Sequence, residues 1–184
     1  MSEDRQDKKE MERLKKLIQE GKMEDAVDRI SIYLNIATEE DYIERLENVI
    51  ETLASVVGGK TVLRFLIEEL IIDIPSILKN ISKRDNILRY SFLLLLKEFC
   101  ENEPELFLPY AGELLNSDDP NVRESMLQLL VFIAGSEQDI IEKGLIEQIA
   151  STLTDEKEFV VEKAKQALKE IGRASCRERV YCEV

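Results

Sequence analysis

The sequence predicts an all-α protein, an α-solenoid built from about five antiparallel helix pairs. From Glu10 onward, apolar residues recur every three or four positions almost to the end of the chain, which is the spacing of one buried helix face. The 184 residues include only four prolines and seven glycines, too few for an all-β protein with many tight turns. The third observation is a repeat of the helix pairs themselves, described below.

Polar breaks interrupt the apolar pattern and divide the chain into expected helices. Gly21 and Gly135 stand where helices should stop, since glycine readily adopts the backbone conformation that ends a helix. "GGK" at 58–60 is expected to be a turn between helices, because it lacks the rest of a phosphate-binding loop. We expect helices at residues 9–20, 23–36, 39–57, 60–72, 74–82, 86–101, 104–116, 120–135, 137–153 and 157–172.

Residues that start helices stand at several of these breaks. Thr38 opens "TEED" and Ser136 opens "SEQD", so each hydroxyl can accept a free backbone amide while an acidic side chain reaches back. In "SDDPNV", Asp119 is expected to cap a helix whose first residue is Pro120, where proline's missing N–H costs nothing.

The helix pairs repeat along the second half of the chain. The segment "IPSILKNISKRDNILRYSFLLLLKEF" aligns with "LPYAGELLNSDDPNVRESMLQLLVFI", and the aligned residues lie 34 positions apart: Pro75 with Pro109, Asp85 with Asp119, Leu88 with Val122, and Arg89 with Arg123. A third copy, "IEQIASTLTDEKEFVVEKAKQALKEIG", follows after 38 positions, with Val161 in place of the arginine. Periods of this size in helix pairs are typical of solenoids.

These repeats resemble the HEAT repeat and, more broadly, the armadillo-like α-solenoids. The residues that carry the resemblance are Pro109, Leu114, Leu115, Asp118, Asp119, Val122 and Arg123. The resemblance implies a right-handed solenoid in which Asp85, Arg89, Asp119 and Arg123 form a structural ladder of hydrogen bonds between adjacent repeats. The alternative for the two arginines is a pair of ligand-binding cations. The earlier pairs lack this signature, and "LIQEGKMEDAVDRISIYL" looks as much like a tetratricopeptide-type hairpin.

The two ends of the chain stand outside the repeat pattern. We expect a disordered charged N-terminus at 1–8, a HEAT-like repeat domain at 9–172, and a non-native or disordered tail at 173–184. At the start of this tail, the stretch "EIGRASCRERV" resembles the conceptual translation of a sequencing-library adapter. That resemblance implies that the natural chain continues with more repeats beyond residue 171, whereas the alternative is a genuine disordered terminus.

Composition argues against several classes of function. The net charge of −13 repels phosphate backbones and anionic lipids, so neither nucleic acid nor membrane is an expected partner. The chain has no histidine, the commonest general base and metal ligand. Cys176 and Cys182 alone cannot complete a tetrahedral metal site, and Cys100 is expected to be a buried small hydrophobe. We therefore expect a cytoplasmic protein with no metal, cofactor or enzymatic activity.

The repeat register identifies candidate partner-binding residues. If the second helix of each pair lines an inner, concave surface, one column of positions faces outward there: Tyr90, Glu124 and Glu162, then Leu94, Gln128 and Gln166, then Lys97, Val131 and Lys169. An aromatic anchor among aliphatic and polar groups suits recognition of another protein.

The expected function is a non-catalytic protein–protein interaction scaffold or adaptor with an acidic concave surface, which favours a partner bearing a basic segment or helix. The alternatives are an ordinary solvated face, a nucleic-acid-associated HEAT-like protein, and a HEAT-like enzyme subunit, because such repeats also occur in bilin lyases and DNA glycosylases.

Overall fold

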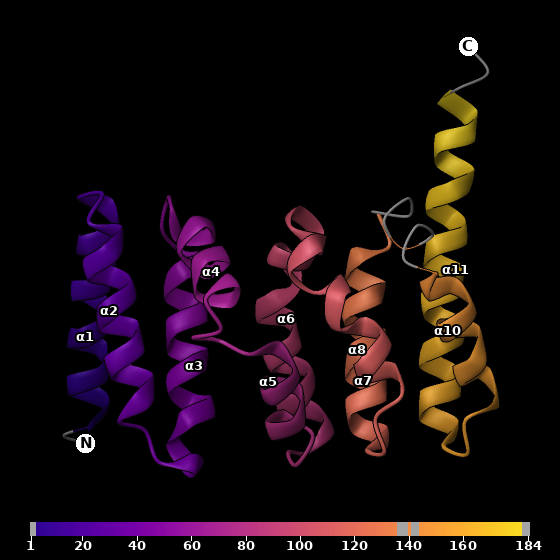
Figure 1. Cartoon of the computed structure of the whole chain (residues 1–184), viewed down its shortest axis with the longest axis horizontal. Coiled ribbons are helices and arrows are strands. Elements are labelled where there is room, and N and C mark those ends of the chain that lie inside the picture. The colour runs from indigo at the N-terminus through magenta and orange to yellow at the C-terminus, as the bar shows by residue number, and fades with distance from the viewer. Residues whose placement is uncertain (1–2, 136–139, 141–143, 182–184) are drawn as a thin grey trace. The chain divides into compact units, whose positions relative to one another are not determined.

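The computed structural model describes residues 3–135, 140 and 144–181, and these residues form α-helices, short 3-10 helices and their connections without any strand (Figure 1). The predicted all-α class is confirmed. The chain divides into two compact units, Met1–Asp73 and Ile74–Val184, which we call unit 1 and unit 2 and describe separately.

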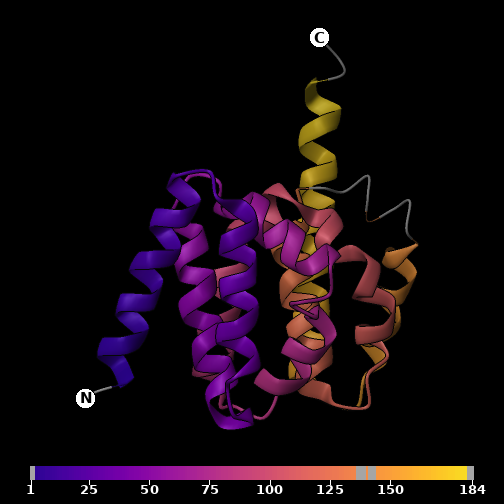
Figure 2. The same cartoon turned by 60° about the vertical axis from the view of Figure 1, so that its left-hand side comes forward.

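Unit 1 is a cluster of helices around an aliphatic core. Its helices are α1 (Glu3–Gln19), α2 (Met23–Asn35), α3 (Glu39–Ala54) and α4 (Gly59–Glu68). α1 packs against both α2 and α3, and α4 packs against α2 and α3 (Figure 2). Leu14, Ile30, Leu46 and Leu66 are fully buried between them, so burial of one apolar face holds each helix in place.

Unit 2 is organised around one central helix. Its helices are α5 (Ile74–Ile81), α6 (Asn86–Asn102), α7 (Ala111–Leu115), α8 (Pro120–Ile133), α10 (Leu145–Ser151) and α11 (Glu158–Tyr181). α8 contacts α5, α6, α7 and α11. Met126, Leu127, Leu129 and Leu130 are completely buried on it, and Ser125 and Gln128 are buried as well, so α8 is covered on most of its circumference by the helices around it.

The helix caps predicted at Thr38 and Asp119 agree with the structure. The Thr38 hydroxyl accepts the Asp41 amide and donates to the Asp41 carboxylate at 2.7 Å. Asp119 accepts the Asn121 amide at 2.8 Å, with Pro120 as the first residue of α8. The cap predicted at Ser136 lies outside the described residues.

Both ends of the chain are more helical than predicted. α1 begins at Glu3, so residues 3–8, predicted to be disordered, are helical. This segment includes glutamate, arginine, glutamine and lysine, which favour helices. Glu10, which follows it in α1, forms an ion pair with Arg29 of α2. α11 continues to Tyr181 rather than ending near 172, since extending an existing helix adds one hydrogen bond per residue fixed.

Three predicted helices are shorter or broken. The segment 104–116 divides into 3-10 turns at Pro104–Leu106 and Leu108–Tyr110 followed by α7, because each proline lacks an N–H and restricts the residue before it. The helix predicted at 60–72 ends at Glu68, where Leu70 adopts a positive φ of 56°. In the segment 137–153, Gly144 with φ of 63° directly precedes α10.

Gly59 provides a test of the α3–α4 turn. A Cβ atom there would lie 1.8 Å from the Leu53 carbonyl oxygen, so Gly59→Ala should lower the free energy of unfolding by about 3 kcal/mol. Gly172, inside α11, has nothing within 4 Å of such a Cβ, and Gly172→Ala should raise stability by about 0.5–1 kcal/mol. Urea unfolding followed by circular dichroism measures both. A Gly59→Ala variant as stable as the parent would contradict the close approach.

Candidate functional site

The buried side chain of Arg89 joins α6 to α8. Its guanidinium donates to the Arg84 carbonyl at 3.2 Å and to the Asn86 side-chain oxygen at 2.8 Å, both close in sequence. It also donates to the Glu124 carboxylate of α8 at 2.8 Å. Only 4% of the Arg89 side chain is exposed, so this cation depends on Glu124 for its neutralisation.

Arg123 makes the corresponding link from α8 to the start of α11. Its Nε and NH2 groups donate to the two carboxylate oxygens of Asp155 at 2.7 and 2.9 Å. Its remaining nitrogen donates to the carbonyls of Ser117 and Asp118 at 2.7 and 3.2 Å. Two-pronged guanidinium–carboxylate pairing fixes both distance and orientation, so it sets where α11 begins relative to α8.

This pair alters the protonation equilibria of both partners. The Arg123 hydrogen bonds hold the pKa of Asp155 below its ordinary value, and the Lys157 amide adds to the effect. Hydrogen bonding to Asp155 raises the pKa of Arg123 further. Both groups therefore stay charged at neutral pH.

The two aspartates predicted to share the ladder have another role. Asp85 accepts the amides of Ile87 and Leu88 at 2.9 and 3.1 Å, and Asp119 caps α8 as described above. Their side chains fold back onto the free amides at the helix start. The arginines reach instead to the following helix pair, where Glu124 and Asp155 receive them.

Further polar contacts join the same helix pairs. The Asn121 side chain donates to the Ser82 carbonyl at 3.1 Å. Lys79 of α5 lies 3.3 Å from the Glu113 carboxylate of α7, 34 positions along the chain. This last pair is exposed at both ends, so we assign it a small part of the stability.

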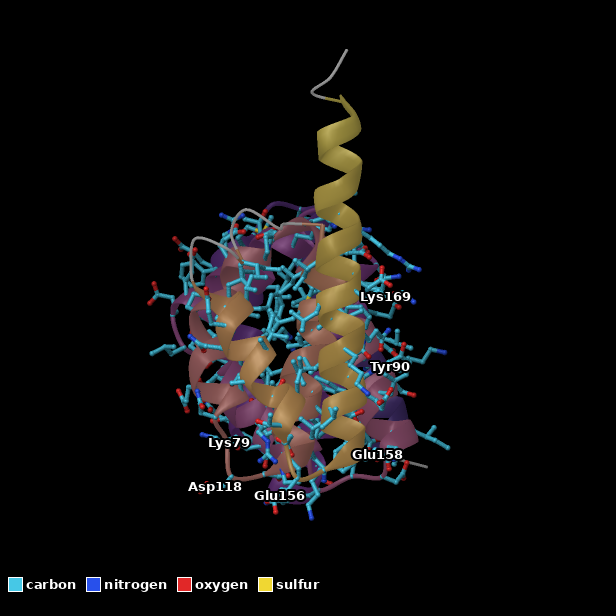
Figure 3. The ribbon with its side chains drawn as sticks, turned by 90° about the vertical axis from the view of Figure 1, so that its right-hand side faces the viewer. Lys79, Tyr90, Asp118, Glu156, Glu158 and Lys169 are labelled. Carbon is cyan, nitrogen blue, oxygen red and sulfur yellow. The ribbon has the colours of Figure 1, made fainter. Side chains whose placement is uncertain are left out.

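The predicted column is largely at the surface of unit 2. α8 contacts both α6 and α11, and Figure 3 shows Tyr90 of α6 and Lys169 of α11 on the same side of this unit. Tyr90 and Leu94 are 45% and 44% exposed. The other exposed members are Lys97, Glu162, Gln166 and Lys169, while Glu124 and Val131 are partly covered.

Gln128 does not lie on the surface, so its expected exposure is wrong. Its side chain is 3% exposed, and the ammonium group of Lys163 donates to its amide oxygen at 2.6 Å. Burial lowers the pKa of Lys163, an effect that the nearby Glu124 carboxylate opposes. The repeat register identifies the right face of α8, but α11 packs closely enough for Lys163 to cover it.

Two exposed apolar residues extend the column by one helical turn. Ile87 precedes Tyr90 by three positions and Phe159 precedes Glu162 by three, and both are exposed. Extending the repeat register by one turn toward the starts of α6 and α11 would have predicted both positions, because residues three positions apart share a helix face. We call Ile87, Tyr90, Leu94 and Phe159 the apolar strip.

The described part of the chain gives little support for a metal site, a reactive thiol or a membrane-spanning helix. No cluster of three acidic or thiol side chains there could hold a metal ion. Cys100 is fully buried, as predicted, and its burial raises the pKa of the thiol, which disfavours the reactive thiolate. Among the described helices, none combines the length and apolarity needed to cross a membrane.

Loss of the buried Arg123 pair should destabilise unit 2. Arg123→Met leaves Asp155 with an uncompensated, mostly buried charge, so we expect the free energy of unfolding to fall by about 3 kcal/mol. The control is Arg173→Met, which removes an exposed pair with Glu170 and should cost less than about 1 kcal/mol. Urea unfolding measures both, and equal losses would refute the special role of Arg123.

The lowered pKa of Asp155 predicts a defined pH dependence. Its carboxylate contributes stability that is complete above its ordinary pKa of 3.8 and is lost as pH falls through the lower folded value. The stability difference between the parent and Asp155→Asn should therefore be constant from about pH 8 to pH 5 and shrink below about pH 4. Urea midpoints across this range measure it, and a difference that grows in acid would contradict the assignment.

Comparisons with known proteins bear on the fold alone. No family model matches the chain, and neither does any curated protein. A crystal structure of an engineered protein from a structural genomics consortium is similar to this chain, with a TM-score of 0.50 and 19% identity over 89% of this chain and 68% of the engineered one. At this identity the likeness concerns the helical fold and carries no function.

Proposed function

We propose that this protein is a non-catalytic scaffold that binds another protein through the face formed by α6, α8 and α11. The observation that carries the proposal is the apolar strip, in which Tyr90 and Leu94 of α6 are nearly half exposed, on a face that also carries polar groups such as Lys97 of α6 and Glu124 of α8. Exposed aromatic and aliphatic side chains within a polar rim are the usual anchors of protein interfaces.

We further propose that the helix pairs of unit 2 form a right-handed, HEAT-like solenoid. The spacing of the contacts between pairs supports this arrangement: Arg89 meets Glu124 35 positions later, and Lys163 meets Gln128 across the same interval. Contacts that recur at the sequence period are expected where each repeat packs on its neighbour.

The state of the ionisable groups supports a non-catalytic role. Catalytic acids and bases usually have a pKa shifted toward neutrality inside a cleft. Glu20 and Asp155 are two carboxyl groups of the described chain with a shifted pKa, and ion-pair partners lower both values. Such carboxylates are held in the charged form and do not exchange protons near neutral pH.

Photo-crosslinking from the apolar strip tests the proposed function. A photoreactive phenylalanine analogue at position 90 of the full chain, activated in the cells that produce the protein, should form adducts with a small set of proteins. Adding Leu94→Asp and Phe159→Asp should reduce these adducts at least about tenfold, since charged groups would replace two apolar anchors. Mass spectrometry identifies and quantifies the adducts.

Leu153 supplies the matched control, because it is an exposed leucine of unit 2 outside the strip. The analogue at position 153 should not capture the same set, and Leu153→Asp should leave the position-90 adducts unchanged. Equal capture from both positions, or no adducts from position 90, would refute binding through this face.

A further inference from the structure

A groove in unit 1 has the features of a second binding site. It has a volume of about 870 Å³ and is bordered by α1, α2 and α3. The repeat register that predicted the column of unit 2 does not extend to these helices, so the groove is independent of the proposal above.

One face of α2 forms the floor of this groove. Asp25, Asp28, Ile32 and Ile36 line it at steps of three or four residues, and so they follow one side of the helix. Ile32 and Ile36 are 63% and 67% exposed. The eleven steps from Asp25 to Ile36 correspond to about 17 Å, or about three helical turns. Two exposed isoleucines one turn apart suit the apolar face of a partner helix.

The charge of the groove selects a cationic partner. Its lining carries six carboxylates but two guanidiniums, and the protein's own groups already engage both guanidiniums. Arg29 donates to the Glu10 carboxylate at 3.0 Å. Arg45 donates to the Tyr33 carbonyl at 2.9 Å and lies 5.0 Å from the centre of the Tyr33 ring. Exposed carboxylates such as Asp28 and Glu44 therefore dominate the field at the groove.

The Tyr33 hydroxyl provides a separate indication of a missing partner. Tyr33 lines the groove, is 6% exposed, and has a buried hydroxyl that makes no hydrogen bond of acceptable geometry. Burial raises its pKa to about 12, and Asn48 and Asp7 lie close enough to influence that value. Because Asp7 and Asn48 lie next to this hydroxyl, a cationic side chain that pairs with Asp7 would come close to the Tyr33 oxygen, which has no hydrogen bond of good geometry to lose.

We propose that this groove binds a basic amphipathic helix of another protein, with its aliphatic residues on Ile32 and Ile36 and its lysine or arginine residues against the carboxylates. A second copy of this chain is a poorer occupant, because its net charge of −13 opposes entry into an acidic groove.

A defined peptide probe tests the proposal on the full chain. The probe is a fluorescent amphipathic helix of about 18 residues, with lysine on its polar face and leucine on its apolar face. A matched peptide carries glutamate in place of lysine. Fluorescence anisotropy should show saturable binding of the lysine peptide that weakens as salt rises to about 0.3 M. The glutamate peptide should not bind.

Charge reversals separate groove binding from general attraction. Asp28→Lys with Glu44→Lys should weaken binding at least about tenfold. The control, Glu68→Lys with Glu69→Lys, changes two exposed carboxylates of unit 1 outside the groove by the same total charge and should change affinity less than about twofold. Equal weakening by both pairs would overturn the proposal, as would the absence of saturable binding by the parent.

Tyr33→Phe distinguishes a binding role of the Tyr33 hydroxyl from a purely structural role. Removing an unpaired buried hydroxyl should leave the melting temperature unchanged or higher, because no bond is lost, while the dissociation constant of the lysine peptide rises several-fold. A lower melting temperature with unchanged affinity would show that the hydroxyl serves the fold. Concentration-dependent self-association that Ile32→Asp abolishes would assign the groove to a second copy instead and refute the proposal.

Discussion

The hydrogen-bonded pair between Arg123 and Asp155 is the interaction on which the arrangement of unit 2 most depends. A guanidinium removed from water must be neutralised and its N–H groups must find acceptors, because an unpaired buried charge is very costly. Arg123 meets both needs with the Asp155 carboxylate and the Ser117 carbonyl. Glu124 neutralises the buried Arg89 guanidinium in the same way. In both cases the carboxylate comes from the next helix pair, so separating neighbouring pairs would leave a buried cation without its partner.

These links determine what the surface of unit 2 can present. Arg89 donates to the Glu124 carboxylate, and Lys163 donates to the Gln128 amide oxygen. The middle of the predicted column therefore joins α8 to α6 and to α11. The side chains left exposed lie mainly on α6 and α11, with Tyr90 and Leu94 the principal apolar members. Unit 1 differs, since two of its exposed apolar residues, Ile32 and Ile36, lie inside an acidic groove. The two surfaces therefore favour different partner chemistry, the first apolar and the second basic.

Much of the helical framework could be predicted from the sequence, because capping and termination depend on local chemistry. The Thr38 and Asp119 caps and the stop at Gly21 follow from the residues at those positions. The turn at Leu70 could not be predicted, because leucine rarely adopts a positive φ; in the structure the turn lets the Ile71 and Ile72 amides donate to the Leu66 carbonyl and buries Ile72. Gln128 illustrates the same limit, since its burial depends on Lys163 from a helix 35 positions away.

The groove of unit 1 could be predicted only in part. The exposure of Ile32 and Ile36 is readable from the α2 pattern, since they stand beside the buried Tyr33 and Leu34 stripe rather than within it. The meeting of carboxylates from α1, α2 and α3, however, depends on how the helices pack. The unpaired Tyr33 hydroxyl has no sequence signal at all.

A double-mutant cycle on Arg89 and Glu124 tests the central claim most directly, namely that buried ion pairs lock neighbouring helix pairs together. Arg89→Met, Glu124→Gln and the double variant would be compared with the parent by urea unfolding. The account predicts a coupling free energy of about 2 kcal/mol or more, with the double variant more stable than the sum of the single losses implies. A coupling below about 0.5 kcal/mol would show that the two residues act independently and would contradict the claim.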